Sequence, residues 1–447
     1  MKHGIKPAVS LPERHGVHLN QSRRIASSLL WFIQDRDAAE PSAAEWQSLG
    51  ETLTQGDPLA DAVAEWLASD AGRGGWSRIE AALMLSDEAA GEIDDEADGE
   101  LNGEMHDKPR TSAPSDSAEI HALLSATQTL PDWVVPEKLD KACEVIARSG
   151  RTGMRVLRDF GLMAGYQASA INQTLVRTGA LEKGAARRVA ETTKWWMDCT
   201  EPGALLPGQA GWRGTLKVRL IHAMVRRQLR LREDWDHDYL GLPVNQLDMQ
   251  VTYLAFSVMF LLGQRLLGTS VSQKEADAVM HLWRYNAWLM GVDEHLLVDD
   301  EQAGRIALYR NLLSQATADE TSAQLGRALL DEPLGRHYPD IIRMGALSLP
   351  WRGQWSARWH RQVHLSIVRF FVGRGGCKAL GLPSSALPWF PLIFAPANLL
   401  VQAVARGIPG GKSWLAQRGR RVQKMQLQIM FGDAKASLLK VGEPSSS

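Results

Sequence analysis

A band of basic side chains around one histidine is the strongest chemical signal in the sequence. In the apolar segment 215–231, a helical period of 100° per residue places five polar side chains in one band roughly 80° wide: Thr215, Arg219, His222, Arg226 and Arg230. The rest of the circumference is mostly apolar, so the helix is buried on most sides and the band must face water or a charged group. An imidazole can ligate a metal and guanidinium groups can pair with carboxylates. The band therefore fits an anionic metal cofactor, and the alternative is a plain solvent-exposed face.

The bulk composition is that of an ordinary soluble globular protein. The chain has 447 residues, 45% hydrophobic and 23% charged, enough for one large core with extensions or for two domains. Its formal net charge of −1 gives no reason to expect nucleic acid as a partner. Three cysteines far apart, with no CxxC pair, fit a reducing compartment and exclude thiolate zinc sites and covalent c-type haem attachment. Because the N-terminal residues carry no secretory signal, we expect a cytoplasmic location.

Helix-period apolar clusters and helix-capping residues predict an all-α chain in four parts. These are a small helical N-terminal region (1–87), an acidic and then Pro/Ser-rich linker (88–117), a main body (118–350), and a helical C-terminal extension with a frayed tail (351–447). In the main body, Asn245 is expected to cap a helix that continues through Leu262. Ser272-Gln-Lys-Glu275 is a capping box that opens a helix over 276–290.

One stretch of the C-terminal extension, residues 386–405, is apolar and uncharged over nearly the length of a membrane span. Pro388, Pro391 and Pro396 are expected to break it as a helix. We therefore expect buried or interfacial apolar packing here, with peripheral membrane contact through 386–405 as the alternative.

Short motifs in a fixed order make much of the chain similar to one known family. They are Leu-Pro-Asp-Trp133, Gly165-Tyr166, Thr178-Gly179, Arg188-Val-Ala-Glu-Thr192, Pro202-Gly-Ala-Leu-Leu-Pro-Gly208, Gly211-Trp212, Arg219-Leu-Ile-His222 with Arg226, Gly-Leu-Pro-Val-Asn-Gln246 and Leu282-Trp-Arg-Tyr285. With these motifs, the chain resembles the family that joins the rubber oxygenases (latex-clearing proteins) and the oxygenase of the fungal mycophenolic-acid pathway. The resemblance covers about residues 123–329 and extends weakly to about 420.

The resemblance implies an all-α, globin-like helical core around a non-covalently bound haem b. It implies that His222 is the axial iron ligand and that Arg219 and Arg226 face the haem propionates. Paired arginines agree with the physical chemistry, because burying two propionates without cationic partners is unfavourable.

On the distal side of the haem, the resemblance points to Arg188, Glu191 and Thr192 as catalytic residues. Glutamate stands here where the rubber oxygenases have a lysine, and the position of their upstream acidic base falls near Asn172. Both departures weaken the case for polyisoprene as the substrate. Glu191 could act as a distal acid/base or form a salt bridge with Arg188 one turn away. Trp195, one turn beyond Thr192, could form part of the pocket wall.

A second histidine pair, His360 and His364, has the i, i+4 spacing of a zinc site. No glutamate lies between the two residues as an HExxH motif requires, so the pair is expected to lie on a surface face of a C-terminal helix.

These features together predict an enzyme, a haem b-dependent oxygenase that acts on a small, apolar, unsaturated substrate of isoprenoid or lipid type with dioxygen. The sequence does not identify a redox partner. One alternative is a haem-binding protein without oxygenase activity, such as a sensor, a carrier or a peroxidase-like enzyme. Another is a cofactor-free helical interaction protein whose arginine band is solvated or meets an acidic partner.

Overall fold

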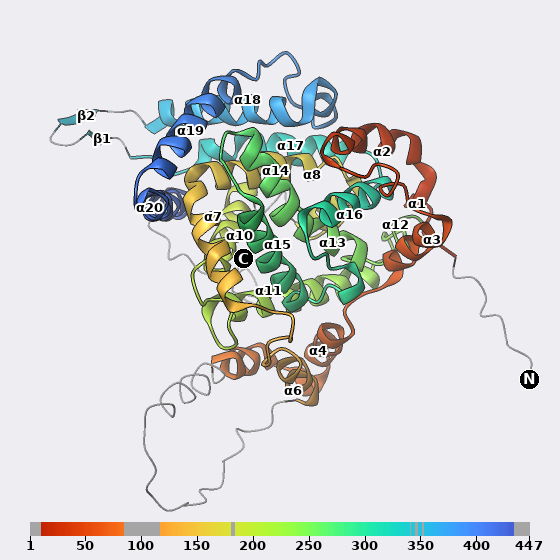
Figure 1. The fold of residues 1–447 in the computed structure, drawn as a ribbon. Helices are drawn as coiled ribbons and strands as arrows, with labels where there is room; N and C mark the ends of the chain where they lie inside the picture. Colours follow the sequence, from red (N-terminus) through yellow and green to blue (C-terminus); the bar gives the residue numbers. More distant parts are fainter. Residues whose placement is uncertain are drawn as a thin grey trace, which may run out of the picture.

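The computed structural model describes residues 10–84, 117–179, 184–339, 341–344, 347–350 and 353–432, and helices make up nearly all of the regular secondary structure within them (Figure 1). Within these residues, one antiparallel hairpin of strands β1 (Ile341–Met344) and β2 (Leu347–Pro350) is the exception. The all-α prediction is confirmed. The linker predicted at 88–117 lies almost wholly outside the described residues.

The helices fall into three groups along the chain. The N-terminal group is α1 (Arg14–Val17), α2 (Leu19–Ala26), η1 (Ser27–Phe32), α3 (Ala43–Glu51), η2 (Thr52–Thr54), α4 (Pro58–Ala68), η3 (Asp70–Gly72) and a helix over 75–84. The main body is α6 (Ala118–Ser125), α7 (Pro136–Val156), η5 (Leu157–Leu162), α8 (Met163–Gly165), α9 (Ser169–Arg177), α10 (Ala185–Cys199), α11 (Ala210–Arg230), α12 (His237–Leu240), α13 (Gln246–Leu254), η6 (Ala255–Met259), α14 (Phe260–Leu266), α15 (Gln273–Leu289), η7 (Glu294–Leu296), α16 (Glu301–Leu313), α17 (Glu320–Asp331) and η8 (Glu332–Gly335). The C-terminal group is α18 (Gly353–Ala379), α19 (Trp389–Gly407) and α20 (Gly411–Phe431).

The N- and C-terminal groups pack directly on the main body. α4 lies against α11 and α2 against α16, and their apolar side chains join the same hydrophobic cluster as α11. α20 lies along α7, where Gly419 is required: a Cβ at this position would come within 2.0 Å of the Ala147 carbonyl oxygen. The hydrophobic core therefore continues across the boundaries between the N-terminal region, the main body and the C-terminal extension that were predicted from the sequence.

Capping residues define the ends of the central helices as predicted. Ser272 and Glu275 form a complete capping box at the start of α15, and the Asn245 side chain accepts a hydrogen bond from the Asp248 amide at the start of α13. α15 begins at Gln273 and ends at Leu289.

The apolar stretch of the C-terminal extension differs from the prediction, because it forms the continuous helix α19. Pro388 is its N-cap and Pro391 lies in its first turn, where an amide hydrogen would have no helical acceptor. Pro396 is inside the helix and removes one backbone hydrogen bond, yet the helix continues to Gly407. The prolines therefore do not break this segment.

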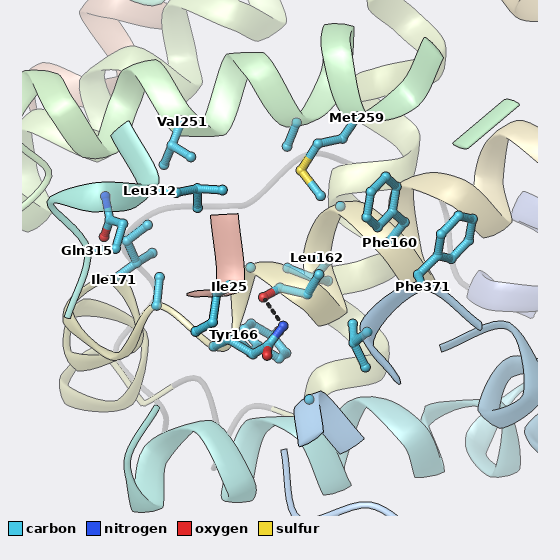
Figure 2. A pocket seen from close by; sticks show the side chains of 18 of the residues that line it. Ile25, Phe160, Leu162, Tyr166, Ile171, Val251, Met259, Leu312, Gln315 and Phe371 are labelled. Carbon is cyan, nitrogen blue, oxygen red and sulfur yellow. Dashed lines mark hydrogen bonds between the residues drawn. The ribbon is translucent and has the colours of Figure 1, made fainter. Parts of the chain in front are cut away.

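Two helices widen into π-helical turns at the middle of the molecule. These turns, η5 and η6, contact each other, and side chains from both line a large cavity (Figure 2). A π-turn inserts an extra residue into the helix, and such turns are often found at functional sites.

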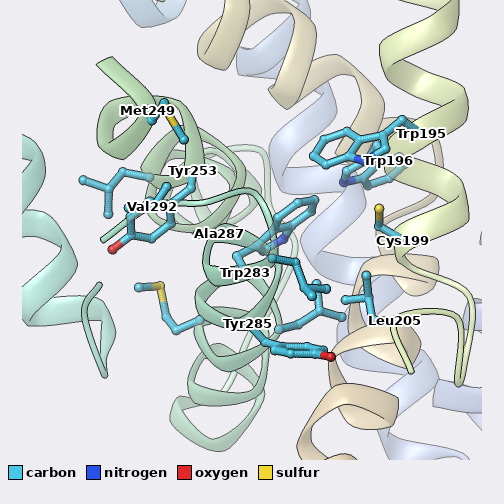
Figure 3. Packing of buried hydrophobic residues seen from close by; sticks show 14 of the residues in the cluster. Trp195, Trp196, Cys199, Leu205, Met249, Tyr253, Trp283, Tyr285, Ala287 and Val292 are labelled. Carbon is cyan, nitrogen blue, oxygen red and sulfur yellow. The ribbon is translucent and has the colours of Figure 1, made fainter. Parts of the chain in front are cut away.

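Aromatic side chains fill the core beside this cavity (Figure 3). Phe256 of η6 stacks on Trp283 at 4.8 Å between ring centroids and meets Trp195 of α10 edge-on at 5.3 Å. The three cysteines are free and buried, and Cys199 lies in the contact between α10 and α11, with its sulfur 3.4 Å from the Thr215 hydroxyl. These contacts hold α10 and α15 against η6, and α10 against α11.

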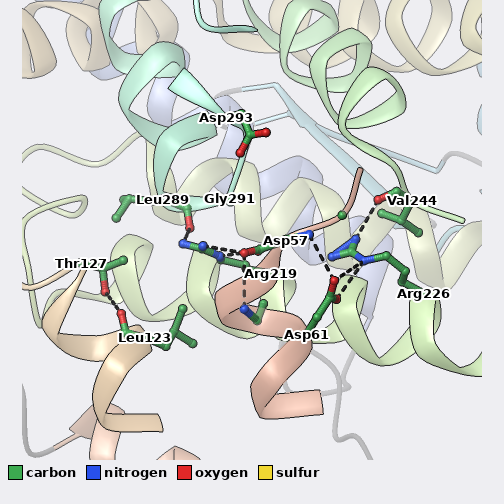
Figure 4. Close-up of polar contacts among 12 residues, drawn as sticks. Asp57, Asp61, Leu123, Thr127, Arg219, Arg226, Val244, Leu289, Gly291 and Asp293 are labelled. Carbon is green, nitrogen blue, oxygen red and sulfur yellow. Dashed lines mark hydrogen bonds and ion pairs between the residues drawn. The ribbon is translucent and has the colours of Figure 1, made fainter. Parts of the chain in front are cut away.

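A row of ion pairs joins α4 to α11 (Figure 4). Asp57 caps α4 and also accepts two hydrogen bonds from Arg219, at 2.6 and 2.8 Å. One turn on, Asp61 pairs with Arg226 at 2.9 Å. Glu65, a further turn on, pairs at 2.8 Å with two arginines near the end of α11, Arg227 and Arg230. The acidic residues at i, i+4 and i+8 of α4 thus match most of the basic band of α11.

The burial of the paired side chains decreases along this row, from Asp57–Arg219 to Glu65–Arg230. Both side chains of the Asp57–Arg219 pair are less than one-tenth exposed, whereas those of the Glu65–Arg230 pair are about half exposed. A buried charge that loses its partner is strongly destabilising, but an exposed pair contributes little. The inner end of the row should therefore dominate its contribution to stability.

We predict that Asp57→Asn, which retains a capping side chain but removes the charge, lowers the free energy of unfolding by about 3 kcal/mol because Arg219 stays buried without a counter-charge. Glu65→Gln at the exposed end is the matched control and should cost less than about 1 kcal/mol. Urea unfolding followed by circular dichroism measures both, and equal losses would contradict the graded row.

Candidate active site

The cavity between the two π-turns has a volume of about 810 Å³, within the range of about 300–1,000 Å³ that is usual for small-molecule sites. Its wall is mainly apolar and comes from α2, η5, α9, η6, α16 and α18. The side chains seen in Figure 2 include Ile25, Phe160, Leu162, Ile171, Val251, Met259, Leu312 and Phe371. Such a wall excludes water and suits an apolar ligand.

Helix α10 contributes polar side chains to this wall. Arg188, Thr192 and Trp196 follow one another at four-residue spacing, and all three line the cavity. Arg188 donates a hydrogen bond to the Tyr166 hydroxyl, and its Nη1 is buried without a partner among the described residues. A buried guanidinium nitrogen without an acceptor is unfavourable unless something else occupies the site. Arg188 and Thr192 are therefore placed where a bound molecule could accept their hydrogen bonds.

Glu191, the third residue proposed for the distal side, is not among the residues that line the cavity. Its carboxylate pairs with Arg187 at 2.8 Å, so the predicted salt bridge exists but its partner is Arg187 and not Arg188. Residues 187 and 191 lie on a different face of α10 from residues 188 and 192, and this explains the change of partner.

Tyr166 was missed as a site residue, although the Gly165-Tyr166 motif pointed to it. Its ring lines the cavity, and its hydroxyl holds Arg188. Burial raises the pKa of Tyr166, so the phenol stays protonated at neutral pH. Asn172, at the position of the upstream base, is fully buried and donates to the Tyr166 carbonyl and the Ser322 hydroxyl. Asn172 thus positions Tyr166 and does not line the cavity.

His222 lies in a different environment from the other predicted site residues. Burial, with Arg226 nearby, lowers the pKa of its imidazole to about 4, and Nδ1 is buried without a hydrogen-bond partner among the described residues. The residue nevertheless keeps part of its surface free of protein contact. His222 is not among the residues that line the 810 Å³ cavity.

The helix pair α10–α11 relates His222 to the cavity wall. The Trp195 indole donates to the Thr215 hydroxyl at 3.2 Å, and Gly211 lies against Cys199, so the two helices run antiparallel. His222 lies seven residues, or about two turns, after Thr215 on α11. Arg188 lies seven residues before Trp195 on α10. The register therefore brings His222 level with Arg188 on the neighbouring helix. Trp195 itself packs in this contact, and Trp196 lines the cavity in its place.

Arg219 and Arg226, which were predicted to face the haem propionates, are both hydrogen-bonded within the chain. All three Arg219 nitrogens donate, to the Asp57 carboxylate and to the Leu289 carbonyl. Arg226 donates to Asp61 and the Val244 carbonyl, but its Nη2 is buried without a partner among the described residues. Asp57 and Asp61, at the start and in the first turn of α4, thus pair with these two arginines within the chain.

The second histidine pair was wrongly expected at the surface. His364 is buried, with Nδ1 2.6 Å from the Asp159 carboxylate, and His360 is partly buried and stacks on Tyr338. Burial lowers the pKa of His360 to about 4. His364 belongs to the packing between α18 and η5, whereas His360 contacts Tyr338 in the segment that follows η8.

Comparison with known proteins agrees with this architecture. The family described as "ER-bound oxygenase mpaB/B'/Rubber oxygenase, catalytic domain" matches residues 154–406, more than half of the chain. A curated relative, the rubber oxygenase of Streptomyces sp. (strain K30), is 24% identical over 295 residues, which are 65% of this chain and 66% of that protein, just under two thirds of its length. The solved structure of latex clearing protein LCP in the closed state has a TM-score of 0.54 at 18% identity, covering 83% of this chain and 91% of the other.

The structural likeness supports the all-α fold, and the family match includes helix α11 with His222 and the cavity-lining residues of α10. The chain belongs to the family of mpaB-type and rubber oxygenase catalytic domains.

Proposed function

We propose that the protein is a haem b-dependent oxygenase that acts on an apolar, unsaturated substrate of isoprenoid or lipid type, with His222 as the axial iron ligand. The observation that carries this proposal is a buried imidazole, held neutral, with a nitrogen that finds no partner in the described chain. Metal ligation requires the neutral imidazole. Because buried polar atoms normally have a hydrogen-bond partner, a buried nitrogen without one is a candidate to bind a ligand.

The residues present fit a haem in part. His222 and the Nη2 of Arg226, which has no partner among the described residues, could meet the iron and one carboxylate of the cofactor, whereas each nitrogen of Arg219 already donates one hydrogen bond within the chain. The buried Asp57 would then orient Arg219 and set the electrostatics beside the imidazole. The arginine band thus has a structural role that does not depend on a cofactor.

When bound, a haem iron would supply dioxygen binding and the oxygen chemistry. The chain's own contribution is positioning. Arg188, held by Tyr166, has an N–H group without a partner among the described residues, and the Thr192 hydroxyl is a second polar group on the same wall. Both could donate hydrogen bonds to a bound molecule. The surrounding apolar side chains bind a hydrocarbon substrate and exclude water. Glu191 is not needed for these steps because it is paired with Arg187.

Haem binding is the first test. The purified protein, supplied with haem if necessary, should show a Soret band, and His222→Ala should abolish it because the axial ligand is lost. His295→Ala, which removes an exposed histidine, should leave the band unchanged. No band in the wild-type protein after haem addition would overturn the proposal and leave a cofactor-free protein.

The pH dependence of the haem-free protein tests the environment of His222. Between pH 6.5 and pH 4, the unfolded histidine binds a proton that the folded one does not, so stability falls as the pH falls through this window. From pH 7 to pH 4.5 the wild type should lose about 2–3 kcal/mol more than His222→Gln in urea unfolding. Equal losses in the two proteins would show that the ring is not held neutral.

The distal assignment is tested on haem-loaded variants by oxygen consumption with unsaturated isoprenoids and lipids. Arg188→Met and Thr192→Val should each lower kcat at least about tenfold while the Soret band remains, because each removes one donor from the cavity wall. Arg187→Met, one residue away and mostly exposed, is the matched control and should stay within about twofold. Equal effects of Arg187→Met and Arg188→Met would rule out the assignment.

A further inference from the structure

In helix α19 the polar side chains face the protein and the apolar side chains face outward, which is the opposite of the usual pattern for a helix on a protein surface. Its polar residues face the protein: Asn398 donates to the Leu267 carbonyl at 2.9 Å and to the Thr269 hydroxyl at 3.1 Å. Arg406, two turns on, contacts Ser270 and Glu275, and Gln402 between them is buried. The polar row at i, i+4 and i+8 thus anchors the helix to the loop between α14 and α15.

The outward face of α19 is apolar and uncovered. Leu392, Ile393 and Leu400 are each more than 60% exposed, and two further side chains, Leu399 and Val404, are more than half exposed. Scattered exposed apolar residues are common, but a continuous apolar face of this length marks a binding surface. α19 is also long and apolar enough to cross a membrane, although only 17% of its apolar window is buried within the protein.

Exposed tryptophans with basic neighbours flank this face. Trp359 of α18, itself 54% exposed, contacts the Trp389 ring at the start of α19, and Trp414 lies just beyond its end on α20. Trp414 lies under the guanidinium of Arg418, and Trp355 on α18 has the exposed Arg358 one turn away. Figure 1 shows α19 at the outer edge of the molecule, close to α18 and α20. Tryptophan and arginine side by side are typical of a protein surface at the headgroup level of a membrane.

The charge of the surrounding segment is wholly positive. Residues 341–432 contain 13 of the 50 lysines and arginines of the chain and none of its 51 acidic residues. Five of these cations pair with acidic residues outside the segment: Arg361, Arg406, Lys412, Arg420 and Lys424. The remaining residues are correspondingly acidic, although the whole chain is nearly neutral. A basic segment around an apolar face complements an anionic lipid surface, with its negative headgroups above an apolar interior.

From this reversed polarity, the flanking tryptophans and the acid-free segment, we propose that α19 docks the protein on an anionic membrane surface. The helix lies in the plane of the interface, with the face of Ile393 and Leu400 among the acyl chains. It does not cross the bilayer, because its inward row of Asn398, Gln402 and Arg406 is hydrogen-bonded or buried against the protein. α18 packs on α19 and also lines the 810 Å³ cavity, so docking brings the cavity wall close to the membrane.

Vesicle binding by the full chain tests this proposal, and it requires neither haem nor activity. The protein should co-float with vesicles of phosphatidylcholine and phosphatidylglycerol (3:1), bind at least tenfold less to phosphatidylcholine alone, and be released by 0.5 M salt or by mild alkaline washing. Ile393→Glu/Leu400→Glu should lower binding at least tenfold with an unchanged circular dichroism spectrum. Val17→Glu, a substitution of an exposed apolar residue on α1, should bind as the wild type does.

Other outcomes overturn the proposal in different ways. Equal binding of Ile393→Glu/Leu400→Glu and the wild type would mean that α19 is not the contact. Retention on vesicles after alkaline washing would indicate a spanning helix. A wild-type dimer in sedimentation equilibrium that the double variant loses, without vesicle binding, would identify a second copy of the chain as the occupant. Failure of haem binding would leave this proposal intact, since no residue of α19 contributes to the candidate active site.

Discussion

The buried ion pair between Asp57 and Arg219 is the constraint on which the rest of the site depends. It lies at the inner end of the row between α4 and α11, and it links the first hundred residues to the helix that carries His222. Arg219 is fixed in position by the Asp57 carboxylate and the Leu289 carbonyl, so the N-terminal group and α15 both determine how α11 is presented. The N-terminal group, which lies outside the family match to residues 154–406, is therefore part of the structural support of the site.

Local patterns in the sequence were sufficient to predict the helices but not their partners. The capping box at Ser272 and the Asn245 cap act within a few residues, so their consequences can be read from the sequence directly. The basic band of α11 was also visible as a helical pattern. Its counterpart on α4 lies 162 residues away for the Asp57–Arg219 pair. No local rule relates the two segments, although the i, i+4, i+8 acidic row of Asp57, Asp61 and Glu65 was a usable signal.

Errors in the site came from helix faces and from burial. Arg188 and Glu191 are three residues apart, and spacing alone did not indicate that one would face the cavity and the other Arg187. His364 was expected at the surface because histidines on amphipathic helices commonly lie there, but Asp159 on η5 provides a buried partner. Pro388 and Pro391 lie at the start of α19, where proline is compatible with a helix, and Pro396 is tolerated because the helix is packed against the protein on one side. The expectation that proline breaks a helix therefore did not hold for this segment.

Sulfhydryl chemistry is affected by the burial of all three cysteines. Burial raises the pKa of Cys143 and Cys199 to about 12 and also raises that of Cys377, so at neutral pH the reactive thiolate is essentially absent. Peroxide and alkylating reagents act on thiolates, and the folded protein offers them none. The three native thiols are therefore poorly reactive toward peroxide and alkylating reagents in the folded protein. A cysteine introduced on the surface would be selectively labelled by an alkylating reagent, while the three buried native thiols would not react.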